Sequence, residues 1–225
     1  MTHVKTFCLA AAMALAATAA PAHAQDARDG HASVGVTAGT LGIGPEVGYR
    51  FNETVGVRAN ATFLSLHHSF DSDDIDYRGN VDLRSGGAIV DIYPFGGGFR
   101  ISGGARINGN KGRLSATPTT NTRIGNATFT PTQIGTISGR AETRDFVPQA
   151  TIGYGGSLGQ GFSIGVEAGA LFQGRVRIRD FAANGTLASN PIFISQLEEE
   201  RRDLQDDVDD YRVYPILQLN AKYRF

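Results

Sequence analysis

The stretch that decides the fold is the last one, VYPILQLNAKYRF, at residues 213–225. Its side chains alternate between two kinds. One parity is apolar and the other is mostly polar: Pro215, Leu217, Leu219, Ala221, Tyr223 and Phe225 alternate with Ile216, Gln218, Asn220, Lys222 and Arg224. Successive side chains of a β-strand point to opposite faces, so this stretch predicts a strand with one apolar face and one polar face.

The same two-residue period recurs from the start of the patterned region to its end. It is clearest at 99–108 and 162–173, where apolar residues alternate with Arg, Asn, Glu, Gln, Ser and Gly. Period-two alternation is the main sequence signal for a half-buried strand. We predict eight strands, at about 32–40, 43–51, 55–68, 81–95, 99–114, 136–158, 162–180 and 213–225.

Three short turns separate these strands at one end: Asn52-Glu53-Thr54, Gly96-Gly97-Gly98 and Gly159-Gln160-Gly161. Four longer connections are expected at the other end. An even number of strands, with short turns on one side and long loops on the other, is typical of a bacterial outer-membrane barrel. The apolar phase switches within 81–95 and again near Asp145, which predicts either bulges or strand parts that stand clear of a membrane.

The connection at 190–211 changes period. Asn190 is a suitable helix cap, with Pro191 at the first helical position. Apolar residues then follow at helical spacing: Leu197, Leu204, Val208 and Tyr211. We predict one acidic amphipathic helix at about 191–210, packed on the rim or loops or, alternatively, binding a partner or capping the lumen. Glu198 and Arg202 are expected to pair, and 115–135 is expected to be a polar loop.

Composition excludes several classes. The 225 residues carry a net charge of −1, include 29 glycines and lack Trp. A chain without a basic surplus is a poor candidate for nucleic-acid binding. Abundant glycine disfavours a helical bundle, because glycine weakens helix interiors by about 1 kcal/mol.

The first 24 residues are predicted to be a cleaved signal peptide. Lys5 precedes an alanine-rich apolar run that ends in Ala22-His23-Ala24, a typical cleavage motif. The single cysteine, Cys8, lies in this segment, so the mature chain 25–225 needs no disulfide framework. This domain is expected to be the outer-membrane barrel.

The alternation is compatible with two kinds of β protein in which the apolar face points in opposite directions. A soluble β protein places apolar residues inside, whereas a membrane barrel turns them toward lipid and encloses the polar ones. Loop asymmetry and small apolar residues that would fill a soluble core poorly favour the membrane: Val34, Val36, Ala38, Ala59, Ala61, Ala105, Ala168 and Ala170. The fold class predicted is all-β, a single closed antiparallel eight-stranded transmembrane β-barrel with one amphipathic helix in the last long connection.

The end of the chain resembles the C-terminal signature of bacterial outer-membrane barrels. This signature is the alternating series Leu217, Leu219, Tyr223 and Phe225, with Phe as the final residue. Residues 46–51 and 93–96 resemble short exported barrel proteins, and the mature chain is similar to the small OmpW/OmpX/OmpA-like class. The resemblance implies that the insertion machinery reads the final strand. Contacts with outer-membrane lipid and lipopolysaccharide follow from this location.

With this orientation the interior is expected to hold an ion-paired network that plugs the lumen, because an eight-stranded barrel is just wide enough for side chains to fill. The network would comprise Glu46, Arg50, Arg58, Asp91, Arg100, Arg106, Glu167, Gln218, Lys222 and Arg224. Asn60, Asn108, Gln149, Gln173 and Asn220 would accompany it. No cofactor and no metal is expected.

Signals for chemistry are weak. His67 and His68 lie near Ser65, but adjacent strand residues face opposite ways and no second half of a catalytic site is visible. The acidic run 71–76 fails the EF-hand pattern, and the glycines at 104 and 109 are not followed by the Lys of a P-loop. An arginine series is expected to pair with loop carboxylates or, alternatively, to bind lipopolysaccharide phosphates: Arg175, Arg177 and Arg179.

The leading hypothesis is therefore a non-enzymatic outer-membrane barrel with a structural, adhesive or narrow permeability role. A lipid A-modifying barrel enzyme and a soluble periplasmic β protein with reversed faces are the alternatives.

Overall fold

The computed structural model describes residues 31–72 and 74–225. The predicted signal peptide, 1–24, lies outside the described residues. Neither helix among the described residues is long and apolar enough to cross a membrane.

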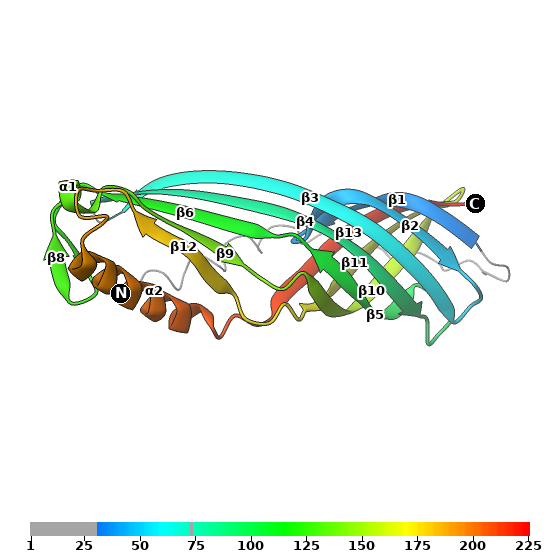
Figure 1. Cartoon of the computed structure of the whole chain (residues 1–225). Coiled ribbons are helices and arrows are strands. Elements are labelled where there is room, and N and C mark those ends of the chain that lie inside the picture. Colours follow the sequence, from blue (N-terminus) through cyan, green and yellow to red (C-terminus); the bar gives the residue numbers. More distant parts are fainter. Residues whose placement is uncertain (1–30, 73) are drawn as a thin grey trace.

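Eight antiparallel strands close into a ring (Figure 1). In ring order these are β1 (His31–Gly39), β2 (Gly42–Arg50), β3 (Val55–Ser72), β4 (Ile75–Ile92), β5 (Phe99–Asn108), β10 (Phe146–Gly159), β11 (Phe162–Leu171) and β13 (Tyr214–Arg224). The ring is closed by two pairings between strands: β1 pairs with the last strand, β13, and β4 pairs with β5. Residues 31 and 225 lie at one end of the ring, called here the terminal end.

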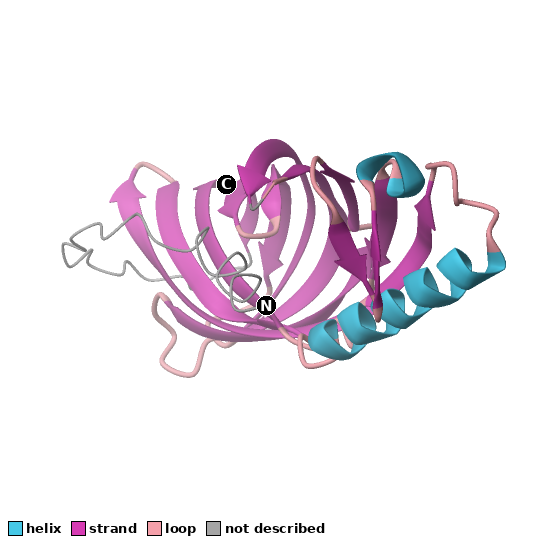
Figure 2. Ribbon diagram, turned by 90° about the vertical axis from the view of Figure 1, so that its left-hand side faces the viewer, coloured by secondary structure: helices cyan, strands magenta, loops and turns pink. Residues whose placement is uncertain are grey.

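The outer halves of β3 and β4 continue beyond the ring at its other end, the loop end. There β4 pairs with β6 (Lys111–Pro118), β6 with β9 (Ile137–Glu142), and β9 with β12 (Arg177–Ala183). We call this sheet the extension. The hairpin β7 (Thr122–Ile124) and β8 (Ala127–Phe129) and the short helix α1 (Pro131–Ile134) lie at its tip, and α2 (Pro191–Val208) runs alongside its strands (Figures 1 and 2).

Three predicted strands are each divided in two. The stretches 99–114, 136–158 and 162–180 break where the chain leaves the ring and enters the extension. The backbone bond from Asn108 N–H to the carbonyl of Asp145, at 2.6 Å, marks one such point of departure. The alternation of apolar and polar residues continues from the ring into the extension, because both sheets require it. Only the strands that pair with each segment change.

The phase switch predicted in 81–95 has the same origin. Residues 75–82 of β4 pair with β6, and residues 85–92 pair with β5. Against β3 the register runs without a shift, so β4 has no bulge there. The part of the strand that changes phase belongs to the extension.

Three expected connections were wrong. The first of the four long connections is a two-residue turn, Thr40-Leu41, and the interval 69–80 is mostly paired strand. The expected loop 115–135 contains β7, β8 and α1, which pack apolar side chains under α2.

The predicted helix is confirmed as α2, with its cap. The Asn190 side chain accepts hydrogen bonds from Ile192 N and Phe193 N, satisfying two amide groups that a helix start leaves unpaired. The sequence indicated that Glu198 and Arg202 can pair weakly, and Arg202 acts on Glu198 only through its charge, without a direct ion pair. Glu198 binds Arg201 instead, with Oε1 to Nη2 at 2.6 Å, because the i,i+3 geometry gives a two-pronged contact.

The helix packs over a small apolar core in the extension. Phe193 and Leu197 are buried there against Ile124 and Ile134. The rings of Phe129 and Phe193 meet edge to face, with centroids 5.0 Å apart. Of the predicted stripe only Leu197 is buried, while Tyr211 lies past the helix end and is exposed.

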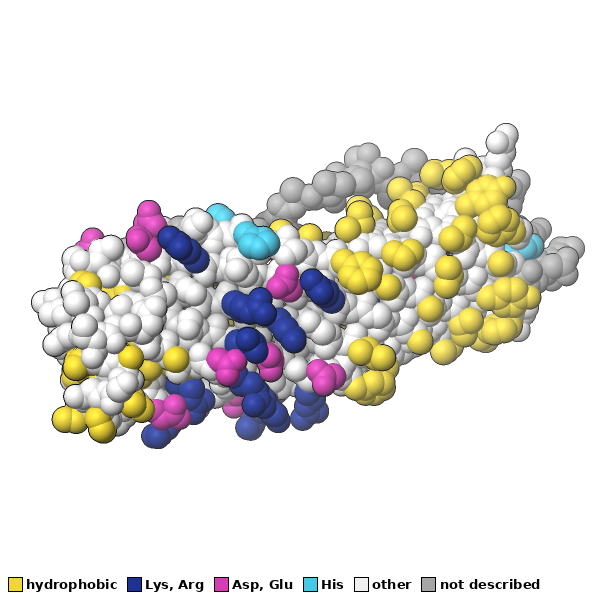
Figure 3. Space-filling model, turned by 45° about the horizontal axis from the view of Figure 1, so that its top comes forward, with side chains coloured by type: hydrophobic (Ala, Val, Ile, Leu, Met, Phe, Trp, Pro, Cys, Tyr) yellow, Lys and Arg dark blue, Asp and Glu magenta, His cyan; other side chains and the backbone are white. Residues whose placement is uncertain are grey.

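The two faces of the ring have the chemistry expected of a membrane barrel. About half of the surface of Ile43 (59 %) or Ile164 (49 %) is exposed, whereas Arg106 (1 %) and Glu167 (4 %) are enclosed. Figure 3 shows hydrophobic side chains gathered over the ring and charged ones over the extension. The alternative of a soluble protein with reversed faces is contradicted by this arrangement.

Candidate functional site in the ring interior

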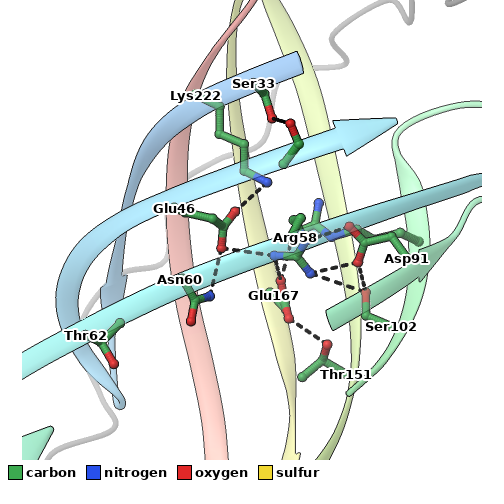
Figure 4. A network of polar contacts seen from close by, with 12 residues as sticks. Ser33, Glu46, Arg58, Asn60, Thr62, Asp91, Ser102, Thr151, Glu167 and Lys222 are labelled. Carbon is green, nitrogen blue, oxygen red and sulfur yellow. Dashed lines mark hydrogen bonds and ion pairs between the residues drawn. The ribbon is translucent and has the colours of Figure 1, made fainter. Parts of the chain in front are cut away.

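Arg58 lies at the centre of the polar interior (Figure 4). It projects inward from β3, because its parity is opposite to that of the exposed Val57. Its Nε lies 2.5 Å from Asp91 Oδ2, and its Nη1 lies 3.2 Å from Glu46 Oε2 and 2.9 Å from Glu167 Oε2. One guanidinium therefore joins carboxylates from three other strands, β4, β2 and β11.

Two further cations complete the cluster. Arg100 Nη2 lies 2.9 Å from Glu167 Oε2, and Lys222 Nζ lies 2.6 Å from Glu46 Oε1. Three cations thus balance three carboxylates: Arg58, Arg100 and Lys222 against Glu46, Asp91 and Glu167. Such pairing lowers the cost of burying these charges, since an isolated buried ion is costly. We call these six residues the ion cluster.

Two hydroxyl groups support the carboxylates. Ser102 Oγ donates to Asp91 Oδ1 at 2.6 Å, and Thr151 Oγ1 donates to Glu167 Oε1 at 2.6 Å. Sequence reasoning missed both residues. Their parity relative to Arg100 and Gln149 was the available signal, but Ser and Thr are common on either face of a strand.

Arg106 forms a separate layer nearer the loop end. It is buried, and its hydrogen-bond partners among the described residues are all neutral. Nη1 donates to Asn60 Oδ1 at 2.8 Å, and Nη2 donates to Thr62 Oγ1 and Ser85 Oγ at 3.2 and 3.0 Å. Gly87 leaves the space that this side chain occupies, because a Cβ there would lie 2.7 Å from Arg106 Nη1.

An apolar layer lies in the interior toward the loop end. Leu41, Val147, Leu171 and Ile216 are buried together and Tyr214 packs against them. Leu41 comes from the two-residue turn between β1 and β2. That turn is tied to β13, because Thr40 N donates to the Leu217 carbonyl at 3.0 Å and Tyr214 Oη donates to the Thr40 carbonyl at 2.7 Å.

The terminal end of the interior is open and basic. A cavity of about 290 Å³ lies there, and we call it the vestibule. The turn residues Gly96, Gly97 and Gly98 and the chain end Phe225 help to form its wall, and the ion cluster forms part of its lining. Arg50 lines it too, with Nη2 donating to the carbonyls of Glu53 and Gly96 and its guanidinium 3.9 Å from the Tyr93 ring centroid.

The structure places all ten predicted lumen residues on the inner face of the ring. Six form the ion cluster, and Arg106 lies in its own layer. Arg50 and Arg224 are partly exposed at the terminal end. Gln218 is buried opposite Glu167 in the pairing of β11 with β13, and its Oε1 has no hydrogen-bond partner among the described residues.

The four residues of the predicted insertion signal lie on the outer face of β13. Phe225 is 71 % exposed, and its ring meets Tyr223 edge to face with centroids 5.1 Å apart. Leu217 and Leu219 are each nearly half exposed. Their recognition by insertion machinery stays a prediction.

One of the weaker sequence candidates, Ser65, is hydrogen-bonded to a carboxylate on the neighbouring strand. Ser65 Oγ donates to Asp82 Oδ1 at 2.6 Å, so this hydroxyl is not bound to His67. That hydrogen bond, aided by nearby cations, lowers the pKa of the Asp82 carboxyl. In the described part of the chain, no three His, Cys, Asp or Glu residues converge on a point where a metal ion would fit.

The arginine series on the extension pairs mainly with carboxylates. Arg175 Nε lies 3.5 Å from Asp209 Oδ2, and Arg179 Nε lies 3.8 Å from Glu142 Oε2. Both contacts are exposed and long, and such pairs contribute little to stability.

Two solved structures share this fold. CarO2 of Acinetobacter baumannii has a TM-score of 0.62 and 19 % identity, over 87 % of this chain and 98 % of that one. CarO of the same organism has a TM-score of 0.58 and 17 % identity, over 86 % and 97 %. A major outer membrane protein from Thermus thermophilus is more distant, with a TM-score of 0.42 and 15 % identity over 87 % and 99 %. No protein-family model and no curated protein matches the chain.

Proposed function

We propose that the chain is an integral outer-membrane β-barrel protein of a Gram-negative bacterium, with a closed interior and no enzymatic role. The observation that supports this proposal is the distribution of side chains, which are apolar on the outside of the ring and polar inside it. The outward face of the ring exposes Ile43, Ile164 and Leu219, whereas Arg58 and Glu167 are enclosed. Lipid accepts an apolar exterior, and a closed ring leaves no unpaired strand edge within it.

The orientation of the barrel in the membrane follows from the lengths of the connections at its two ends. Short turns of such barrels face the periplasm and longer connections face outward. The terminal end, with its three tight turns, therefore faces the periplasm, and the extension stands outside the cell. Lipid and lipopolysaccharide surround the ring, and the barrel-insertion machinery places it there.

The closed interior favours a structural or adhesive role over free diffusion. The ion cluster crosses the interior, and the layer at Leu41 lies between that cluster and the extension. Surface connections carry specificity more readily than a filled interior, because they are free to vary. We assign partner contact to the extension, which α2 stiffens through the core at Phe193.

A narrow permeability role is the second candidate. The vestibule favours it, because the cavity reaches the ion cluster from the terminal end. Passage would require the Leu41 layer and the Arg58 contacts to separate, so conduction by this route would be brief and small.

Planar bilayers and cell fractionation test the proposal together. The purified protein is expected in the outer-membrane fraction, with a gel mobility in detergent that changes on heating. It is expected to give no steady conductance in bilayers. Release with the periplasmic extract would refute the location, and large steady conductance steps would refute the closed interior.

The alternative of a lipid A-modifying enzyme has its own test. A deletion strain is expected to keep its lipid A acylation unchanged. An altered lipid A that is restored by the native protein but not by His67→Ala or His68→Ala would replace the non-enzymatic proposal.

A further inference from the structure

The vestibule has an excess of positive charge that the ion cluster does not neutralise. Inside the cluster three cations meet three carboxylates. Arg50 and Arg224 also line the vestibule, and no carboxylate among the described residues lies within ion-pair distance of either. The two guanidinium groups also repel one another. Two fixed cations therefore face the same small cavity, and neither has an ion pair with a described residue, while Glu53 and Asp91 attract Arg50 from a longer distance.

Buried hydrogen-bond donors at the same cavity point to the same kind of ligand. Arg100 Nε and Asn220 Nδ2 are buried and have no hydrogen-bond partner among the described residues. Both side chains line the vestibule and are about 95 % buried. A buried donor without an acceptor is destabilising, so it marks a place where an acceptor is missing.

Glycines on β10 and β11 make room for these two side chains, and one of them, Gly155, lines the vestibule itself. A Cβ at Gly153 would lie 3.1 Å from Arg100 Nε, and a Cβ at Gly165 would lie 2.7 Å from Asn220 Oδ1. Gly155 is also close to Arg100, at 3.5 Å from Nη1. The glycines therefore leave the room that the Arg100 and Asn220 side chains occupy beside the vestibule.

We infer that the vestibule is a binding site for a small oxyanion, a carboxylate or phosphate group carried on a molecule that fits about 290 Å³. Arg224 and Arg50 supply the charge, and Arg100 and Asn220 supply donors deeper in the cavity. Guanidinium groups suit this ligand because their planar fork matches two oxygens of a carboxylate or phosphate. In the proposed orientation the site opens toward the periplasm.

The backbone of Phe225 sets a limit to the site. Phe225 lines the vestibule, and its backbone oxygen lies 3.2 Å from His31 Nδ1. This contact holds the chain end at the rim, beside the entrance. The ligand is therefore expected to be a small anion that enters past Phe225.

Calorimetric titration of the folded protein in neutral detergent at low salt tests the inference. Succinate and inorganic phosphate are the probes, and sodium chloride at equal ionic strength is the control. We expect saturable heat for at least one oxyanion and none for chloride. Preference for succinate would assign a carboxylate ligand, and preference for phosphate a phosphate one. The absence of saturable heat for both, or equal heat for chloride, would overturn the site.

Variants locate the binding. Arg224→Gln is expected to weaken it by about tenfold or more, because one charge-assisted contact contributes about 1.5–3 kcal/mol. Lys111→Gln removes the same charge from the extension and is the matched control. Asn220→Asp keeps the shape but places a negative charge in the cavity, and it is expected to abolish binding. Unchanged affinity in both vestibule variants would refute the assignment.

This result is independent of the proposed function. A failed titration leaves the barrel, its location and its closed interior untouched. A protein found in the periplasmic extract would still bind the oxyanion.

Discussion

Arg58 Nη1 lies 2.9 Å from Glu167 Oε2, and this ion pair joins strands β3 and β11, which are not neighbours in the ring. The contact therefore crosses the interior. The same guanidinium also binds Asp91 and Glu46, so a single side chain neutralises carboxylates from three directions.

Removing Arg58 is expected to be severe. Arg58→Met leaves Asp91 without its ion-pair partner. The three buried carboxylates then lack the guanidinium that separates and neutralises them. Loss of one partner from a buried ion pair typically lowers the free energy of unfolding by about 3–5 kcal/mol. Urea unfolding of the protein in lipid vesicles measures this. Arg113→Met, with a side chain 52 % exposed and an ion pair at 3.8 Å, is the control and should change stability by less than about 0.5 kcal/mol.

Arg106 is expected to respond differently. It is as buried as Arg58, but its partners Asn60, Thr62 and Ser85 are neutral. Arg106→Met removes an isolated buried charge, and Thr62 Oγ1 and Ser85 Oγ already lie 3.1 Å apart and can bond one another. The same urea experiment should show a loss of about 1 kcal/mol or less. A loss as large as that of Arg58→Met would show that charge balance does not govern this interior.

The extension is expected to lose its order without loss of the ring. Phe193 is 1 % exposed beneath α2, and Phe193→Ala should lower the local stability by about 3–5 kcal/mol. Limited proteolysis should then cleave near α2, while heat-dependent gel mobility is retained. Ile192→Ala, at a neighbouring residue that is 71 % exposed, should leave the cleavage pattern unchanged. Loss of heat-dependent mobility in Phe193→Ala would mean that ring and extension fold as one unit.

The partner of Glu198 can be identified by titration. The hydrogen bond from Arg201 lowers the pKa of the Glu198 carboxyl below 4.5, and the nearby positive charges add to this effect. A depressed folded-state pKa stabilises the protein above the unfolded value of 4.5, and that contribution is lost as the pH falls through the folded-state pKa. Carboxyl NMR titration of Arg201→Met should show the Glu198 pKa rising toward 4.5. Arg202→Met should shift it less, and the reverse order would restore the pairing predicted from sequence.

The final residue is expected to matter for assembly more than for stability. Phe225 is 71 % exposed and contacts Tyr223. Phe225→Ala should reduce the fraction of protein that reaches its heat-modifiable form in the outer membrane. Phe95→Ala changes another exposed aromatic residue, at 81 %, in a turn at the same end, and should have no such effect. Equal losses in both variants would indicate a general need for aromatic rings at the membrane boundary.

Local sequence patterns were enough to predict which side chains face the interior of the ring and where α2 begins. Parity alone placed Glu46, Arg58 and Glu167 on the inner face, because a strand cannot turn one side chain over without turning its neighbours. The cap at Asn190 likewise set the start of α2, because capping depends only on residues within one turn.

The tertiary structure alone decided which inner residues meet. Sequence parity does not give the stagger between strands, so nothing in the chain order shows that Arg58 reaches Glu167 while Arg106 finds only neutral partners. It also did not reveal where β4 exchanges β5 for β6, since alternation is the same in both sheets. The apolar layer at Leu41 and the open vestibule depend on this three-dimensional register, because each is formed by side chains from strands and turns that are distant along the chain.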